Sequence, residues 1–208
     1  MNSLPFNTEN ARAWHEGRKT QHRELMKPQS SEKLYEMNNG GWRMLSDIDG
    51  KNIIKCPYKV GEKVFIQEDW GVAPCYNYFT SETIPLSSAR HISYRCDQIT
   101  DNHHNNIDKW RDPKAMPEKY SRSTAIITCI RVERIQSITE EDCEAEGIVG
   151  VSAASPINAL PVEHYYSGGL SHNTPREAYE SMWGDIYGDE SWQHNYWVWV
   201  YELKKGGE

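Results

Sequence analysis

The stretch NYWVWVYEL, residues 195–203 near the end of the chain, is apolar on both faces of the strand that it predicts. Side chains of a β-strand point alternately to opposite sides, so Trp197 and Trp199 share one face while Val198 and Val200 share the other. Both faces therefore need apolar partners. We expect a strand that is buried on both sides within a packed sheet.

Three other stretches carry the signals of short helices. Residues 139–147 (TEEDCEAEG) begin with a threonine N-cap and a capping-box aspartate, and they end at a glycine. Residues 174–188 (TPREAYESMWGDIYG) also begin with threonine and end at glycine, with an apolar stripe that includes Ile186. A shorter helix is predicted over residues 9–16, with Thr8 as its N-cap.

The remaining segments predict short strands separated by long excursions. Residues 63–68 and 123–135 are rich in β-forming residues. Residues 28–58, 74–118 and 149–173 are rich in turn-forming residues, so we expect loop-rich insertions there. Within 74–118 a short strand is predicted at HISYRC, residues 91–96, between two excursions. Short strands, capped helices and the lack of an internal repeat predict a single α+β domain around a small barrel.

Charge and cysteine content limit the function classes. The 208-residue chain has 30 acidic against 23 basic side chains, a formal net charge of −7, which argues against a protein that coats duplex DNA. Its five cysteines form no C-x-x-C pair, and we expect reduced thiols in the cytoplasm. There is no apolar run of about 20 residues and no signal-peptide core, so no membrane partner is expected.

The exception to the acidic balance is EGRKTQHREL, residues 16–25. It places Arg18, Lys19, His22 and Arg23 within six positions. Taken alone, such a run is typical of a solvated strand edge, where cations discourage pairing with other chains. The other interpretation is a local pocket that faces an anion or a polarised carbonyl.

A family resemblance favours the pocket. The stretches GRKTQHR, GEKVFIQEDW, RVERIQSITEEDCEAEGI and WVWVYELKK, in that order, resemble the ASCH family, a branch of the PUA-like barrels, and in particular its long-loop phage and prophage versions. The resemblance implies a small PUA-like mixed β-barrel with flanking short helices and long loop insertions. It also implies a ligand that is a nucleoside, a nucleotide or single-stranded RNA, with no cofactor.

Some ASCH proteins are similar in these motifs and remove the acetyl group from N4-acetylcytidine. Their proposed catalytic set is a lysine in G-R-K-T, a threonine three residues later, and a glutamate near the end of a T-E-x-x-x-E-x-E helix. The resemblance transfers the lysine to Lys19 and the glutamate to Glu146. At the threonine position this chain has His22, so the nucleophile of the family is missing.

Hydrolysis of an N-acyl bond needs a nucleophile, a base and a donor for the developing oxyanion. Neighbouring cations lower the pKa of a lysine, and the end of a helix raises the pKa of a carboxylate such as Glu146. Three interpretations stay open. Thr20 replaces the missing hydroxyl, Glu146 or neutral His22 activates water, or the pocket binds without reacting.

The sequence offers further ligand-binding candidates. Glu68 and Trp70 in QEDW follow a predicted strand, where a tryptophan can stack on a base and a carboxylate can accept an amino proton. Arg122 precedes the long β-rich run and is a candidate phosphate contact. The alternatives are that Trp70 belongs to the core and that Glu68 and Arg122 form ion pairs.

The sequence also bears on two other classes of function. His103 and His104 lie next to Asp101 and near Asp108, but adjacent histidines usually point apart in a strand or loop, so no metal site is predicted. The acidic surface and the long loops also suit a non-catalytic phage protein that binds and inhibits a host or nucleic-acid-processing protein.

Overall fold

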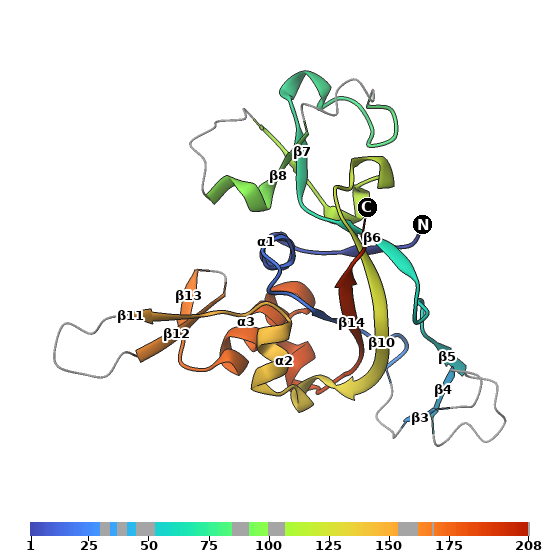
Figure 1. The fold of residues 1–208 in the computed structure, drawn as a ribbon, viewed down its shortest axis with the longest axis vertical. Coiled ribbons are helices and arrows are strands. Elements are labelled where there is room, and N and C mark those ends of the chain that lie inside the picture. Colours follow the sequence, from blue (N-terminus) through green and yellow to red (C-terminus); the bar gives the residue numbers. More distant parts are fainter. Residues whose placement is uncertain are drawn as a thin grey trace.

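The computed structural model describes residues 1–29, 34–36, 41–44, 53–84, 92–99, 107–153, 162–167 and 169–207. Within these residues the chain is a mixed α+β structure with several sheets and few helices, which confirms the predicted class (Figure 1). None of the helices in these ranges has the length and the apolar character that a membrane span requires.

A five-stranded sheet forms the centre of the structure (Figure 1). Its strands, in spatial order, are β1 (Ser3–Pro5), β6 (Lys63–Gln67), β10 (Thr124–Arg134), β14 (Trp197–Lys205) and β2 (Gln21–Leu25). The β1 and β6 strands are parallel, and the other neighbours are antiparallel. The long β10–β14 ladder is therefore the framework of the sheet: β6 pairs with β10 on one side and carries β1, and β2 pairs with β14 on the other side.

The terminal strand is buried on both faces, as its alternation predicts. Trp199 and Tyr201 belong to a core cluster that also contains Trp14. Val198 and Val200 belong to a second cluster on the other face, which contains Trp183. The sheet thus separates two apolar layers.

Four helices pack around this sheet: α1 (Thr8–His15), α2 (Glu140–Ala145), α3 (Pro175–Tyr187) and α4 (Asp189–Gln193). The capping box of α2 and the threonine cap of α3 are confirmed. The predicted cap of α1 is wrong by one residue, because the side chain of Asn7, not of Thr8, accepts the Asn10 N–H. Ile186 also departs from the predicted apolar stripe, since it is 42% exposed.

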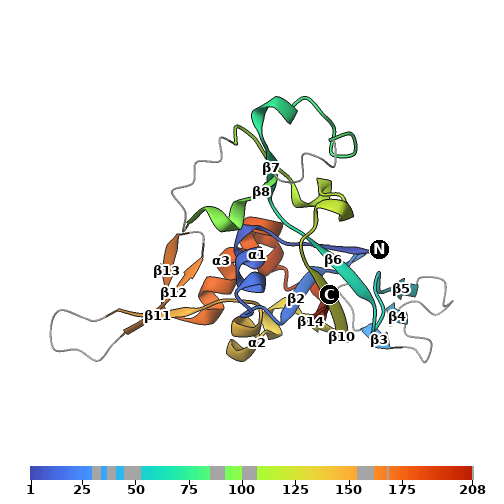
Figure 2. The ribbon, with the colours of Figure 1, turned by 45° about the horizontal axis from the view of Figure 1, so that its top comes forward.

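Three small three-stranded antiparallel sheets lie around the central sheet in Figures 1 and 2. Two of them form within the predicted insertions 28–58 and 149–173, and the third combines two strands of the insertion 74–118 with one strand that precedes it. Their strands are β3 (Leu34–Glu36), β4 (Gly41–Met44) and β5 (Ile53–Lys55); β7 (Trp70–Val72), β8 (Ile92–Tyr94) and β9 (Trp110–Arg111); and β11 (Gly150–Ala153), β12 (Val162–Ser167) and β13 (Leu170–His172). Several segments that were predicted as loops form strands in these sheets, because strand formation depends on pairing with neighbouring strands and not on composition alone.

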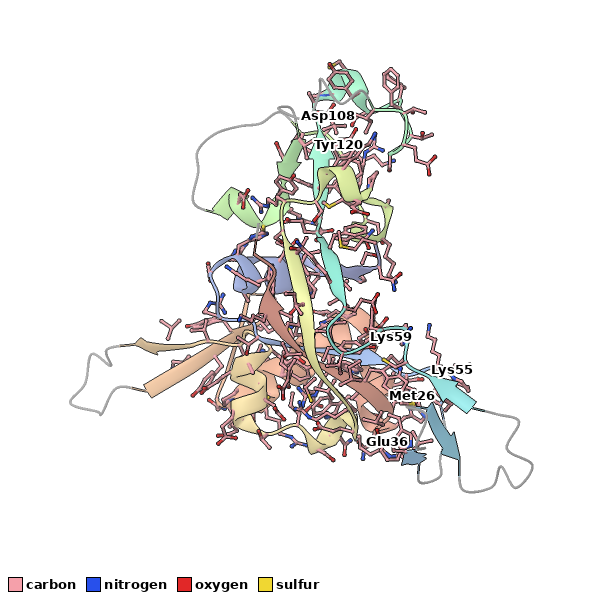
Figure 3. All side chains as sticks on the ribbon, turned by 45° about the vertical axis from the view of Figure 1, so that its right-hand side comes forward. Met26, Glu36, Lys55, Lys59, Asp108 and Tyr120 are labelled. Carbon is pink, nitrogen blue, oxygen red and sulfur yellow. The ribbon has the colours of Figure 1, made fainter. Side chains whose placement is uncertain are left out.

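Single 3₁₀ turns join several of these strands: η1 (Pro74–Tyr76), η3 (Arg95–Ile99), η4 (Pro113–Ala115), η5 (Glu118–Tyr120) and η6 (Ile135–Ser137). The β7–β8–β9 lobe has a core of its own, in which Trp70 and Tyr120 are buried and their rings lie 5.6 Å apart. The Tyr120 hydroxyl donates to the Ile84 carbonyl at 2.7 Å. Figure 3 labels Tyr120 within this lobe and Asp108 nearer its tip.

The edges of the central sheet are β1 and β2, which do not pair with each other in the described residues. Residues from both edges nevertheless line one cleft: Pro5 and Phe6 at the end of β1, and His22 and Glu24 on β2. The sheet therefore curves so that its two edges face the same space.

Candidate functional site

The centre of the candidate site is an ion pair between Lys19 and Glu146. The Lys19 Nζ donates to Glu146 Oε2 at 2.6 Å and to the Glu146 carbonyl at 3.0 Å, and the two residues are 1% and 2% exposed. Glu146 is the C-cap of α2, and Gly147 then turns the chain with a φ of 106°. Two residues that are 127 positions apart are thus brought together, as predicted.

Arg23 completes the charge network from β2. Its guanidinium contacts Glu146 Oε1 at 3.2 Å, Asp142 at 2.8 Å and Glu133 at 3.0 Å, and it also donates to the Gln21 side chain. Burial lowers the pKa of Lys19, the Arg23 charge lowers it further, and Glu146 partly offsets both effects. The charge of Arg23 is therefore largely offset by carboxylates, which occupy its two terminal nitrogens.

His22 lies on the other side of β2 and is 7% exposed. Its ring packs 5.1 Å from that of Phe6 and 6.4 Å from that of Tyr201. Burial lowers its pKa well below the usual value, and the charges of Lys19 and Arg23 add to this effect. His22 is consequently neutral at pH 7, as a general base or a hydrogen-bond partner has to be.

A cleft of about 710 Å³ opens beside His22, between the two sheet edges. A smaller recess of about 60 Å³ lies next to it, and the two cavities share Pro5, Asn7, His22, Ile186 and Tyr187. The recess is therefore the inner end of the cleft.

Besides Pro5 of β1, four elements contribute to the walls of the recess. Arg23, Glu146, Asn10 and Trp183 line it, from β2, the end of α2, α1 and α3. Figures 1 and 2 both place α1 close to α3. Lys19 does not line it, so Glu146 is the member of the ion pair that faces the cavity.

The outer cleft carries charges of both signs. Lys27, Lys55 and Lys114 line it, and no ion pair is found for these lysines among the described residues (Figure 3 labels Lys55 on β5). Glu24 is half-buried on the wall, two residues after His22. Burial raises its pKa, although the Tyr201 hydroxyl donates to it at 3.3 Å.

Three further carboxylates line this cleft: Asp69, Asp112 and Asp185. Asp69 accepts the Thr8 hydroxyl at 2.6 Å, and Asp112 accepts the Lys114 backbone N–H at 2.7 Å. These two carboxylates are thus partly used by the fold, whereas the lysine ammonium groups are available to a ligand.

Two predicted residues of the basic segment lie outside the recess. Thr20 is exposed, and its backbone, not its hydroxyl, makes its described bonds, to Ala145 and Leu203. Arg18 pairs with Glu16 and donates to the Gly147 carbonyl. Thr20 is exposed and does not line the recess that Glu146 lines, so the hydroxyl replacement finds no support in the geometry.

Glu68 and Arg122 form a second cluster, apart from the cleft. Arg122 holds Glu68 through two 2.9 Å bonds, His15 contacts the same carboxylate at 3.1 Å, and the Cys96 thiol donates to it at 3.0 Å. Burial alone would raise the pKa of Glu68, but its histidine and arginine partners outweigh burial and lower it to about 2. The geometry matches the ion-pair alternative.

Trp70 is 0% exposed and packs inside the β7–β8–β9 lobe, with the Arg111 guanidinium 5.2 Å from its ring. No face of the indole is open to a base. The tryptophan is therefore a core residue in this structure, as in the alternative interpretation.

One group of potential metal ligands exists among the described residues. The donor atoms of His15, Glu68 and Cys96 lie within 4.8 Å of one another. Arg122 contacts both Glu68 and Cys96, so its guanidinium already supplies the positive charge, and a metal ion would have to displace it. The sequence candidates His103 and His104 lie outside the described residues.

Sequence reasoning missed several residues of the cleft. Glu24 follows His22 by two positions, so strand alternation alone places it on the same face. Asn10 lies on a predicted helix and had no motif to mark it. Lys27, Lys55 and Lys114 come from three separate segments, and only the tertiary structure brings them to one cavity.

Comparisons of the chain with protein-family models, with curated proteins and with solved structures found no match.

Proposed function

We propose that the chain is an ASCH-type, PUA-like protein that binds a modified nucleoside or nucleotide in the cleft and hydrolyses an N-acyl group on its base. The observation that carries this proposal is the position of Glu146. A buried carboxylate, fixed by Lys19 at 2.6 Å and by Arg23 at 3.2 Å, lines the inner recess of an open cleft. Buried carboxylates on cavity walls are typical general bases.

In this mechanism water is the nucleophile, since His22 replaces the family threonine and Thr20 lies elsewhere. Glu146 takes a proton from the water, whose oxygen attacks the acyl carbon. The C–N bond then breaks, the proton passes to the leaving amine, and the products are the free nucleoside and a carboxylate. The Arg23 guanidinium stabilises the oxyanion that develops on the acyl oxygen.

Lys19 acts through Glu146 and is a positioning residue. Its two bonds to the side chain and the carbonyl of Glu146 fix the orientation of the carboxylate. Loss of these bonds is therefore expected to lower kcat without abolishing it.

The lysines of the outer cleft support a ligand that carries phosphate. Three ammonium groups without an ion pair in the described residues suit a nucleotide or the backbone of single-stranded RNA better than a neutral nucleoside. The half-buried ring of Tyr187 lines the same cleft, which suits contact with a planar base.

The test is release of cytidine or its monophosphate from N4-acetylcytidine and N4-acetylcytidine 5′-monophosphate, followed by chromatography. Glu146→Gln should lower kcat by at least about a hundredfold, which is the usual contribution of a general base. Glu144→Gln is the matched control, because Glu144 lies on α2 two positions before Glu146 and is exposed. This variant should retain activity.

Lys19→Met should retain part of the activity, because Arg23 still contacts Glu146. Lack of turnover by the wild-type protein on both compounds, or a Glu146→Gln variant as active as Glu144→Gln, contradicts the proposed hydrolysis.

A further inference from the structure

Two residues that line the recess each carry a buried polar atom with no hydrogen-bond partner among the described residues. The Asn10 Oδ1 and the Arg23 Nε are both buried and unpaired, and both residues line the recess. Asn10 and Arg23 are 4% and 2% exposed, so bulk water does not reach these atoms freely. A buried polar group without a partner is costly, which makes such a pair an indication of a ligand.

The two groups are chemically complementary to a secondary amide. Arg23 Nε–H is a donor, and its other guanidinium nitrogens are already used by carboxylates and Gln21. The Asn10 oxygen is an acceptor. A secondary amide offers the matching set, a carbonyl oxygen that accepts and an N–H that donates.

The size of the recess agrees with this chemistry. Its volume of about 60 Å³ exceeds the ~10–15 Å³ that one water position needs, so it has room for a group of about four heavy atoms. An acetamide group has this size. The apolar side chains of Met182 and Trp183 line the same recess and would contact the methyl end of such a group.

We infer that Asn10 is a specificity-determining residue that holds the amide N–H of an N-acylated base, while Arg23 Nε–H holds its carbonyl oxygen. The inference rests on the proposed function and deepens it, since it names the part of the substrate that enters the recess. It places the acyl carbon next to Glu146, which lines the same recess.

The experiment uses Asn10→Leu, which keeps the branched shape of the side chain but removes its polar atoms. Met182→Leu is the matched control, because it changes an apolar wall of the same recess with little change of volume. The first readout is the affinity for N-methylacetamide and for N,N-dimethylacetamide, measured by titration from the NMR chemical shift of the Trp183 indole N–H. The second is the affinity for N4-acetylcytidine and for cytidine.

We expect the wild-type protein and Met182→Leu to prefer N-methylacetamide over N,N-dimethylacetamide, which has no N–H, by about tenfold, and N4-acetylcytidine over cytidine by a similar factor. Asn10→Leu should lose both preferences. It should also unfold at the same or a higher urea concentration than the wild type, since an unpaired buried oxygen is removed. A merely structural role of Asn10 predicts the opposite change in stability.

Equal preferences in Asn10→Leu and the wild type would overturn the inference and leave the recess as a water site. The proposed function fails in a different way. If the wild type selects the simple secondary amide through Asn10 but neither binds nor hydrolyses N4-acetylcytidine, the amide site stands and the nucleoside substrate is refuted.

Discussion

Replacement of Glu146 by glutamine is expected to destabilise the fold in a pH-dependent way. The substitution leaves the Lys19 ammonium 1% exposed, with the carbonyl of residue 146 as its remaining partner. Loss of one member of a buried ion pair costs about 3–5 kcal/mol of unfolding free energy. Lys19→Met should cost less, because Glu146 keeps its bond to Arg23 at 3.2 Å.

The pH dependence follows from Lys19. Burial already lowers the pKa of Lys19 from its usual 10.5, and the loss of Glu146 lowers it further. Between this lowered pKa and about 10.5 the unfolded chain binds one more proton than the folded protein, so stability rises with pH. The slope is at most about 1.4 kcal/mol per pH unit in that window.

The assay is urea unfolding, followed by tryptophan fluorescence at pH 7 and pH 9. Glu144→Gln, on the exposed side of α2, should stay within about 0.5 kcal/mol of the wild type. The double variant Lys19→Met/Glu146→Leu should recover much of the loss, since neither charge is then buried alone. This reasoning would be refuted if the unfolding free energy of Glu146→Gln lay within about 1 kcal/mol of that of the wild type and did not change between pH 7 and pH 9.

Three further outcomes are expected. The partners of Glu68 lower its pKa to about 2, so its ionised form stabilises the fold above pH 4.5 by about 3 kcal/mol, and this stability is lost as the pH falls toward 2. The unfolding free energy of Glu68→Gln, measured as a function of pH, should therefore change less between pH 4.5 and pH 2 than that of the wild type. Gly147→Ala should cost about 1–3 kcal/mol, because its Cβ would lie 2.5 Å from that of Ala13, whereas Gly207→Ala, with no atom within 4 Å, should be neutral in the same unfolding assay. Lys114→Glu should weaken binding of N4-acetylcytidine 5′-monophosphate more than of the nucleoside, and the salt dependence of nucleotide affinity should decrease; an equal loss for both ligands would speak against a phosphate contact.

The local structure of the chain was readable from its sequence where one short-range rule decides it. Alternation of the terminal strand predicted two apolar faces, and both were found. Threonine caps and terminating glycines predicted α2 and α3 closely. The cap of α1 was misplaced because Asn7 and Thr8 are both good caps, and only the backbone geometry selects between them.

The pairing of Lys19 with Glu146 was predicted through the family resemblance and the spacing of its motifs, and the two residues do meet. The sequence did not predict the other ion-pair partners in the site or the residues that line its cavities. Arg23 looked like a free cation, yet it is buried against three carboxylates from two other segments. The sequence left open whether Trp70 stacks on a base or belongs to the core, and the small β7–β8–β9 sheet encloses it.

The sequence by itself determined the terminal strand, the capped helices and the positions of the charged residues, because these properties depend on neighbours within a few positions. The tertiary structure alone decided which charges are neutralised, where a cavity opens, and that Asn10 and Arg23 face the same recess. Those features depend on contacts between residues far apart in the chain, whose positions are set by sheet curvature and packing and not by any local pattern.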